Sequence, residues 1–212
     1  MFKGQVPGSG QRPGLVNVLN WMLVISLAVM AMAGCSSERE QPAGLFNVDS
    51  VIRVQVQNLL AQQATIHKTA RLNGEEKTST VAPGDTVAWE QELSIFLGLD
   101  VLNKPINKGE YTVRTEKDPE TGLQIKSFTT TEDLPVQFLK VYYEESPEDI
   151  RRIEARYHEN NSLYASTRLL TMNFAETNNV RLLSSYQIVG GQKMFLDDSV
   201  EYDITATIDL KK

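Results

Sequence analysis

The sequence predicts an α+β domain in which one curled, mainly antiparallel sheet of roughly seven to nine strands packs against two N-terminal helices. Three observations lead to this class. The C-terminal half alternates apolar and polar residues along several short segments, a pattern typical of strands with one buried face. The connections between these segments are short, so neighbouring strands should pair antiparallel. Two stretches of the N-terminal half instead repeat apolar residues at helical spacing.

The first predicted helix covers residues 48–63 and follows Asn47, a residue type that caps helices well. Apolar side chains recur on one side of it, but Ile52, Val54 and Val56 also alternate with polar neighbours, so a strand remains an alternative. The second predicted helix covers residues 86–97, opened by Pro83-Gly84-Asp85 and ended by Gly98.

Turn signals separate the predicted strands. Asn73-Gly74 tolerates the positive φ angles of a tight hairpin turn and joins residues 66–72 to residues 77–81. Residues 118–122 contain Pro and Gly and join a second hairpin. The remaining predicted strands lie at residues 111–113, 123–125, 136–143, 153–157, 169–174, 181–188, 193–196 and 200–210, with Gly190-Gly191 read as a bend between strands.

The first 34 residues have the features of a secretory signal peptide. Lys3 and Arg12 are their only charged residues, and residues 21–33 are apolar except for Ser26. At 1.5 Å per residue this apolar stretch spans about 20 Å, short of the roughly 30 Å hydrocarbon core. A charged start, a short apolar core and small residues before a cleavage site describe a leader that is removed.

The end of this leader carries the most specific motif of the chain. Met32-Ala33-Gly34-Cys35 resembles the lipobox of bacterial lipoproteins, and Cys35 is the only cysteine. The resemblance implies cleavage between Gly34 and Cys35, followed by a thioether-linked diacylglycerol and an acyl group such as palmitate on Cys35. An ordinary signal peptide, or an uncleaved anchor with an incidental cysteine, is the alternative.

The resemblance also implies a location. Ser36 is not the Asp that retains many such lipoproteins on the inner membrane, so we expect anchoring to the outer membrane of the cell envelope, on its periplasmic face. Residues 35–44 then form the lipidated cysteine and a short polar tether, and residues 45–212 form a single domain. The acyl chains would be the contact with the membrane.

Charge and composition limit the partners of this domain. Loss of the two cations of the leader changes the formal net charge from −6 to −8, which argues against nucleic-acid binding and against electrostatic docking on anionic lipid. His67 and His158 are the only two histidines, too few for a histidine-based zinc site.

No familiar catalytic motif appears in the sequence. It has no Gly-x-Ser-x-Gly turn, no His-Glu-x-x-His helix and no Gly-rich phosphate loop, so we predict no enzyme, no cofactor and no catalytic residue. His158 falls on the polar phase of its strand and is expected to face solvent. The acidic cluster of Asp197, Asp198, Glu201 and Asp203 lacks the spacing of a calcium loop, so we predict no metal site.

The preferred functional prediction is a non-enzymatic lipoprotein with a structural, assembly or protein-binding role at the outer membrane. The alternative is a carrier or receptor for lipid or lipoprotein, with a cavity between the curled sheet and the helices. In layout the chain resembles outer-membrane lipoprotein receptors, and in its order of elements it is similar to uncharacterised lipoproteins of Bacteroidota-type bacteria. Neither resemblance carries a ligand-binding residue.

Overall fold

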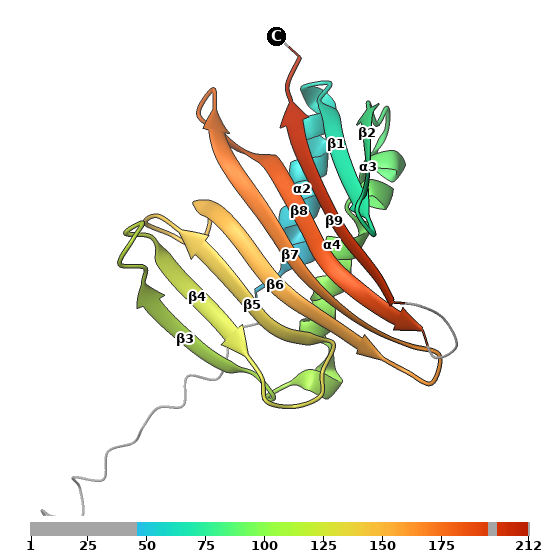
Figure 1. Ribbon diagram of the computed structural model, residues 1–212. Helices are drawn as coiled ribbons and strands as arrows, with labels where there is room; N and C mark the ends of the chain where they lie inside the picture. Colours follow the sequence, from blue (N-terminus) through green and yellow to red (C-terminus); the bar gives the residue numbers. More distant parts are fainter. Residues whose placement is uncertain (1–45, 195–198, 212) are drawn as a thin grey trace, which may run out of the picture. The chain divides into compact units, whose positions relative to one another are not determined.

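The computed structural model describes residues 46–194 and 199–211, which form one open antiparallel sheet of nine strands with helices against one face (Figure 1). The predicted signal peptide, the predicted lipobox with Gly34 and Cys35, and the predicted tether lie outside the described residues. In the described part of the chain, no helix has the length and hydropathy needed to cross a membrane.

The first predicted helix is confirmed as α2 (Val48–Ala61). The Asn47 side chain caps it by accepting a hydrogen bond from the Ser50 amide at 2.7 Å. Val54, which would belong to the buried face of a strand, is exposed instead. The helix buries a stripe of residues at helical spacing, Val48, Ile52, Gln55, Val56 and Leu59.

The second predicted helix is divided into α3 (Thr86–Glu92) and α4 (Ser94–Leu97), and the α-helix ends at Leu97 with Gly98 as its C-cap, as predicted. Gly98 keeps right-handed helical angles (φ −59°, ψ −20°), so the chain continues into two 3₁₀ helices, η1 (Gly98–Asn103) and η2 (Pro105–Asn107). Leu99 and Leu102 are fully buried, which accounts for the continuation. These helices follow the first hairpin, so they are not a purely N-terminal layer.

The strands follow in chain order, and every neighbouring pair in the sheet is antiparallel. They are β1 (Thr65–Leu72), β2 (Glu75–Val81), β3 (Thr112–Lys117), β4 (Gln124–Thr129), β5 (Val136–Tyr143), β6 (Ile150–Asn160), β7 (Tyr164–Thr177), β8 (Val180–Met194) and β9 (Ser199–Asp209). Their order across the sheet is β2-β1-β9-β8-β7-β6-β5-β4-β3, so β2 and β3 are the edges.

The prediction that Gly190-Gly191 bends the chain between two strands is wrong. Both glycines lie inside β8 and pair with Arg168 and Thr167 of β7. A Cβ at position 190 would lie 2.6 Å from the Thr167 carbonyl oxygen and 2.9 Å from the Tyr202 hydroxyl. Glycine is therefore required here by a close approach within the sheet.

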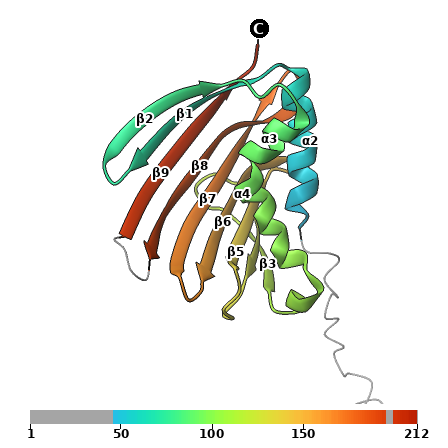
Figure 2. The same cartoon turned by 90° about the vertical axis from the view of Figure 1, so that its right-hand side faces the viewer.

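The helices all cover the same face, which we call the inner face, and the opposite face of the sheet is the outer face (Figure 2). Strand alternation places one set of side chains on each. Tyr186 of β8, for example, lies between Ala206 of β9 and Met172 of β7 on the inner face, and all three are buried. The main core is formed on this inner side, between sheet and helices.

Gln55 joins α2 to the sheet through two hydrogen bonds. Its amide group donates to the Arg181 carbonyl oxygen at 3.1 Å and its side-chain oxygen accepts from the Leu183 amide at 2.8 Å. The pairing of β8 with β9 ends at Ser185, so β9 does not reach these two backbone groups. The Gln55 side chain, which is buried, replaces the missing strand.

Candidate functional site

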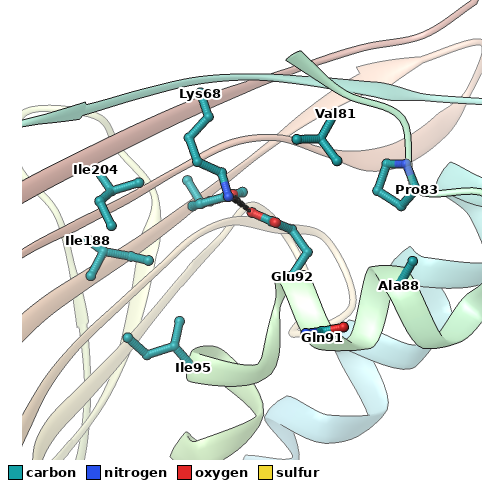
Figure 3. Close-up of a pocket in the computed structure, with 10 residues that line it drawn as sticks. Lys68, Val81, Pro83, Ala88, Gln91, Glu92, Ile95, Ile188 and Ile204 are labelled. Atoms are coloured by element: carbon teal, nitrogen blue, oxygen red, sulfur yellow. Dashed lines mark hydrogen bonds and ion pairs between the residues drawn. The ribbon is translucent and has the colours of Figure 1, made fainter. Parts of the chain in front are cut away.

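A cavity of about 490 Å³ lies between the helical layer and the β1, β2, β8 and β9 strands (Figure 3). This volume falls within the roughly 300–1,000 Å³ range of small-molecule sites. Its lining is largely aliphatic, with a few polar side chains: Lys68, Val81, Pro83, Ala88, Gln91, Glu92, Ile95, Tyr186, Ile188 and Ile204.

The register of the sheet explains the lining. Ile188 and Ile204 are partners across β8 and β9, and Lys68 lies opposite Ala206, the next inner position along β9. Ile95 of α4 faces the two isoleucines from the helical side (Figure 3). The cavity is therefore bounded by inner-face side chains of the sheet on one side and by α3 and α4 on the other.

Three polar side chains meet in the lining of the cavity, where Figure 3 shows Lys68 and Glu92 between the isoleucines on one side and Val81 and Pro83 on the other. Glu92 of α3 lies 2.5 Å from the Lys68 ammonium, and the Tyr186 hydroxyl donates a hydrogen bond to the same carboxylate oxygen. All three are shielded from water, with exposed side-chain fractions of 24% for Lys68 and 15% for Glu92, and with Tyr186 only 1% exposed. This cluster connects α3 to the β1 and β8 strands.

Tyr186 is fixed as a hydrogen-bond donor. Burial raises the pKa of its hydroxyl far above the ordinary value, and the hydrogen bond to Glu92 and the charge of that carboxylate raise it further. The Phe96 ring of α4 packs edge-on against the Tyr186 ring, with centroids 5.6 Å apart and planes at 72°. A phenol held protonated in this way orients a partner and is unsuited to act as a base near neutral pH.

The sequence contains one signal for this site that belongs to no catalytic or binding motif. Lys68 lies between Ile66 and Ala70 in the phase of the strand that faces the core, where a cation requires a partner. Its partner Glu92 directly precedes the buried Leu93 at the end of α3. A sequence cannot show that these two side chains meet, because β1 and α3 are brought together only by the tertiary fold.

The residues singled out in the sequence do not belong to this cavity. His158 lies on the outer face beside Thr167, 3.2 Å from its hydroxyl, and His67 is exposed between Thr80 and Asp209. Within residues 46–194 and 199–211 no group of three or more His, Cys, Asp or Glu side chains is arranged to hold a metal ion. Asp197 and Asp198 lie outside the described residues.

No protein-family model matches the chain, and comparisons with curated proteins and with solved structures find no match either.

Proposed function

We propose that this chain is a non-enzymatic, lipid-anchored protein of the cell envelope whose domain binds an apolar ligand between its sheet and its helices. The observation that carries the proposal is the aliphatic cavity bounded by Ile95, Ile188 and Ile204. Apolar walls with a few convergent polar groups are the usual form of a site for small molecules. This is the carrier or receptor role expected as the alternative from the sequence.

The anchor part of the proposal rests on Met32-Ala33-Gly34-Cys35. With Cys35 acylated, the protein would stay on the membrane without spanning it, because several acyl chains exceed the two-signal threshold for stable attachment. Metabolic labelling with radioactive palmitate tests this directly. Wild type should be labelled and Cys35→Ser should not, and equal labelling of the two would refute the anchor.

Ligand binding can be tested with a fatty alcohol that carries a photoactivatable diazirine in its chain. The full-length lipidated protein in phosphatidylcholine vesicles is irradiated with this probe, and cross-linked peptides are mapped by mass spectrometry. We expect adducts on the peptides that contain Ile95, Ile188 and Ile204. Adducts spread evenly over both faces of the sheet would contradict a defined site.

A matched pair of variants makes this test specific. Ile204→Trp fills the cavity and should lower cross-linking several-fold, since Ile204 lines it. Thr205→Trp places the same ring on the exposed outer face, one residue further along β9, and should leave cross-linking unchanged. Equal yields from the two variants would argue against the cavity as the binding site.

The outer face favours the structural, assembly or protein-binding role as a second candidate. The Phe138 ring has the Lys140 ammonium 5.7 Å from its centroid and the Arg156 guanidinium 5.4 Å from it. On the same face, Arg152 stacks over Tyr142 at 5.6 Å. Aromatic residues and Arg are enriched in protein interfaces and among their energetic hot spots.

In-cell cross-linking tests this second role. A photo-cross-linking amino acid at position 138 should give a discrete adduct with an envelope protein if the outer face is an interface. The same amino acid at position 54, an exposed site on α2, is the control and should give none. Identical patterns at the two positions would contradict a specific interface.

A further inference from the structure

Arg168 of β7 lies on the inner face, one step beyond the aliphatic lining of the cavity. It pairs with Gly190, which is two residues along β8 from Ile188, and Gly190 pairs with Tyr202, which is two residues along β9 from Ile204. A two-residue step along a strand is about 7 Å. Figure 2 shows that this end of β8 and β9 extends beyond the helices. By the strand register, Arg168 therefore lies one inner position past Ile188 and Ile204, next to the cavity lining.

The Arg168 side chain is held in place by two tyrosines. Its Nε donates a hydrogen bond to the Tyr202 hydroxyl at 3.1 Å, and its guanidinium lies over the Tyr157 ring, 5.7 Å from the centroid. The Tyr202 hydroxyl occupies the space that a Cβ at Gly190 would need, because the two atoms would be only 2.9 Å apart. The glycine in β8 thus lets Tyr202 lie across the sheet and reach Arg168.

The charge of Arg168 is not neutralised within the described part of the chain. No carboxylate there forms an ion pair with it, whereas Lys68, the other cation of this region, lies 2.5 Å from Glu92. Glu159, on neighbouring β6, accepts a hydrogen bond from the Tyr164 hydroxyl at 2.5 Å. The buried Ser166 hydroxyl, one inner position along β7 from Arg168, has no protein partner among the described residues.

A guanidinium fixed through its Nε presents its remaining N–H groups as a planar fork. This fork matches the oxygens of a carboxylate or a phosphate and binds them with charge-assisted hydrogen bonds. Stacking on Tyr157 keeps the fork in one orientation, so little side-chain entropy is lost when an anion binds. The arrangement selects an anion next to an apolar space.

We infer that Arg168 binds the anionic head group of an amphiphile whose hydrocarbon chain lies in the cavity between Ile95, Ile188 and Ile204. The inference rests on the proposed ligand-binding function and names the chemical class of the ligand, a carboxylate or phosphate joined to an aliphatic chain. Lys68 does not serve this purpose, because its charge is already balanced by Glu92. Arg168 is the cation that remains for the ligand.

The test compares three diazirine probes of equal chain length, a fatty acid, a phosphatidic acid and a neutral fatty alcohol, on the full-length protein in phosphatidylcholine vesicles. Arg168→Gln removes the charge and keeps the length of the side chain. It should lower cross-linking of the fatty acid, the phosphatidic acid or both about tenfold, the scale of one charge-assisted hydrogen-bonded contact. Cross-linking of the alcohol should not change.

Arg114→Gln is the matched control, since Arg114 is an exposed arginine on the outer face of β3 and should have no effect on any probe. Tyr202→Phe keeps the charge and removes the hydrogen bond that orients it, so the anionic probes should lose about two- to threefold. This conservative variant tests the inference independently if Arg168→Gln does not fold, as judged by circular dichroism.

The outcomes separate this inference from the function on which it rests. If the alcohol labels the cavity and neither Arg168→Gln nor Tyr202→Phe weakens any anionic probe, the head-group assignment is overturned and the binding function stands. If none of the three probes labels the cavity, both are overturned. A loss confined to the fatty acid identifies a carboxylate ligand, and one confined to the phosphatidic acid identifies a phosphate.

Discussion

The inner and outer faces of the sheet carry different chemistry on the same strands. One inner row runs through Leu139, Ala155, Leu170, Ile188 and Ile204, which pair across five adjacent strands, and the first four are buried. One residue along, the outer row runs through Phe138, Arg156, Leu169, Val189 and Asp203. Leu169 and Val189 of this row are exposed, at 42% and 38%.

The two faces stabilise the protein through different kinds of interaction. The inner row is covered by helices, so its energy comes from removing apolar surface from water. The outer row faces solvent, where cations stack on aromatic rings and each contact contributes on the order of 0.5–1 kcal/mol. The strands therefore hold the fold together mainly through one face, and the other face is in contact with solvent.

The largest difference between the two faces should appear when one phenylalanine is removed from each. Phe128 of β4 is 1% exposed on the inner face, and Phe128→Ala should lower the free energy of unfolding by about 3–5 kcal/mol. Phe138→Ala, on the outer face of the neighbouring strand, should cost about 1 kcal/mol. Urea denaturation followed by circular dichroism measures both, and equal losses would contradict the assignment of faces.

A second test concerns the helix that covers the inner face. Gln55→Ala should lower the free energy of unfolding by about 3 kcal/mol, because it leaves the Leu183 amide and the Arg181 carbonyl without their partner. Gln57→Ala, on the exposed side of the same helix, should stay within about 0.5 kcal/mol of wild type. A loss from Gln57→Ala as large as that from Gln55→Ala would mean that helix propensity, and not the link to β8, is responsible.

The two adjacent glycines of β8 allow a crowded backbone position to be compared with an open one. Gly190→Ala should cost about 2 kcal/mol, because the added methyl would lie 2.6 Å from the Thr167 carbonyl oxygen. Gly191→Ala meets the Val200 carbonyl oxygen at an ordinary 3.6 Å and should be tolerated. The thermal midpoints of the two variants check this, and a smaller loss for position 190 would refute the close approach of Tyr202.

The smallest expected effect depends on pH. Burial raises the pKa of the Tyr111 hydroxyl, which donates to the Val136 carbonyl oxygen, from 10.0 to about 12. The folded state thus holds this proton more tightly, and the stability it gives below pH 10 is lost as the pH rises through 12. Between pH 8 and pH 11 wild type should lose about 1 kcal/mol more than Tyr111→Phe in urea denaturation. Equal losses would show that Tyr111 is not protected by burial.

Local patterns in the sequence predicted most of the sheet. The Asn73-Gly74 turn lies between β1 and β2, and the alternation of residues 200–210 becomes β9, because turn chemistry and period-two burial act over short distances. The alternation of apolar and polar residues within 52–56 also favours a strand, which is wrong. The segment forms helix α2 because its buried helical stripe packs on β8. That competition is settled by tertiary contact.

The candidate site could be predicted only in part. Nothing in the neighbourhood of Gly190 signals that Tyr202 will lie over it, so two glycines in succession looked like a bend. Lys68 was recognisable as a cation in a buried phase, but Glu92 and Tyr186 reach it from other elements of the fold. Cavities depend on such long-range placement, which a single sequence does not specify.

The pairing of β1 with the last strand has a consequence for how the chain folds. Ile66 lies opposite Ile208, so β9 is inserted between the first hairpin and β8, and the two contacting segments lie near opposite ends of the domain. Until the C-terminal strand is available, β1 and β8 both present unpaired edges that are prone to association. The sheet is therefore completed by a strand that is synthesised after the eight others, and a nascent or truncated chain that lacks it exposes two unpaired edges at the centre of the sheet.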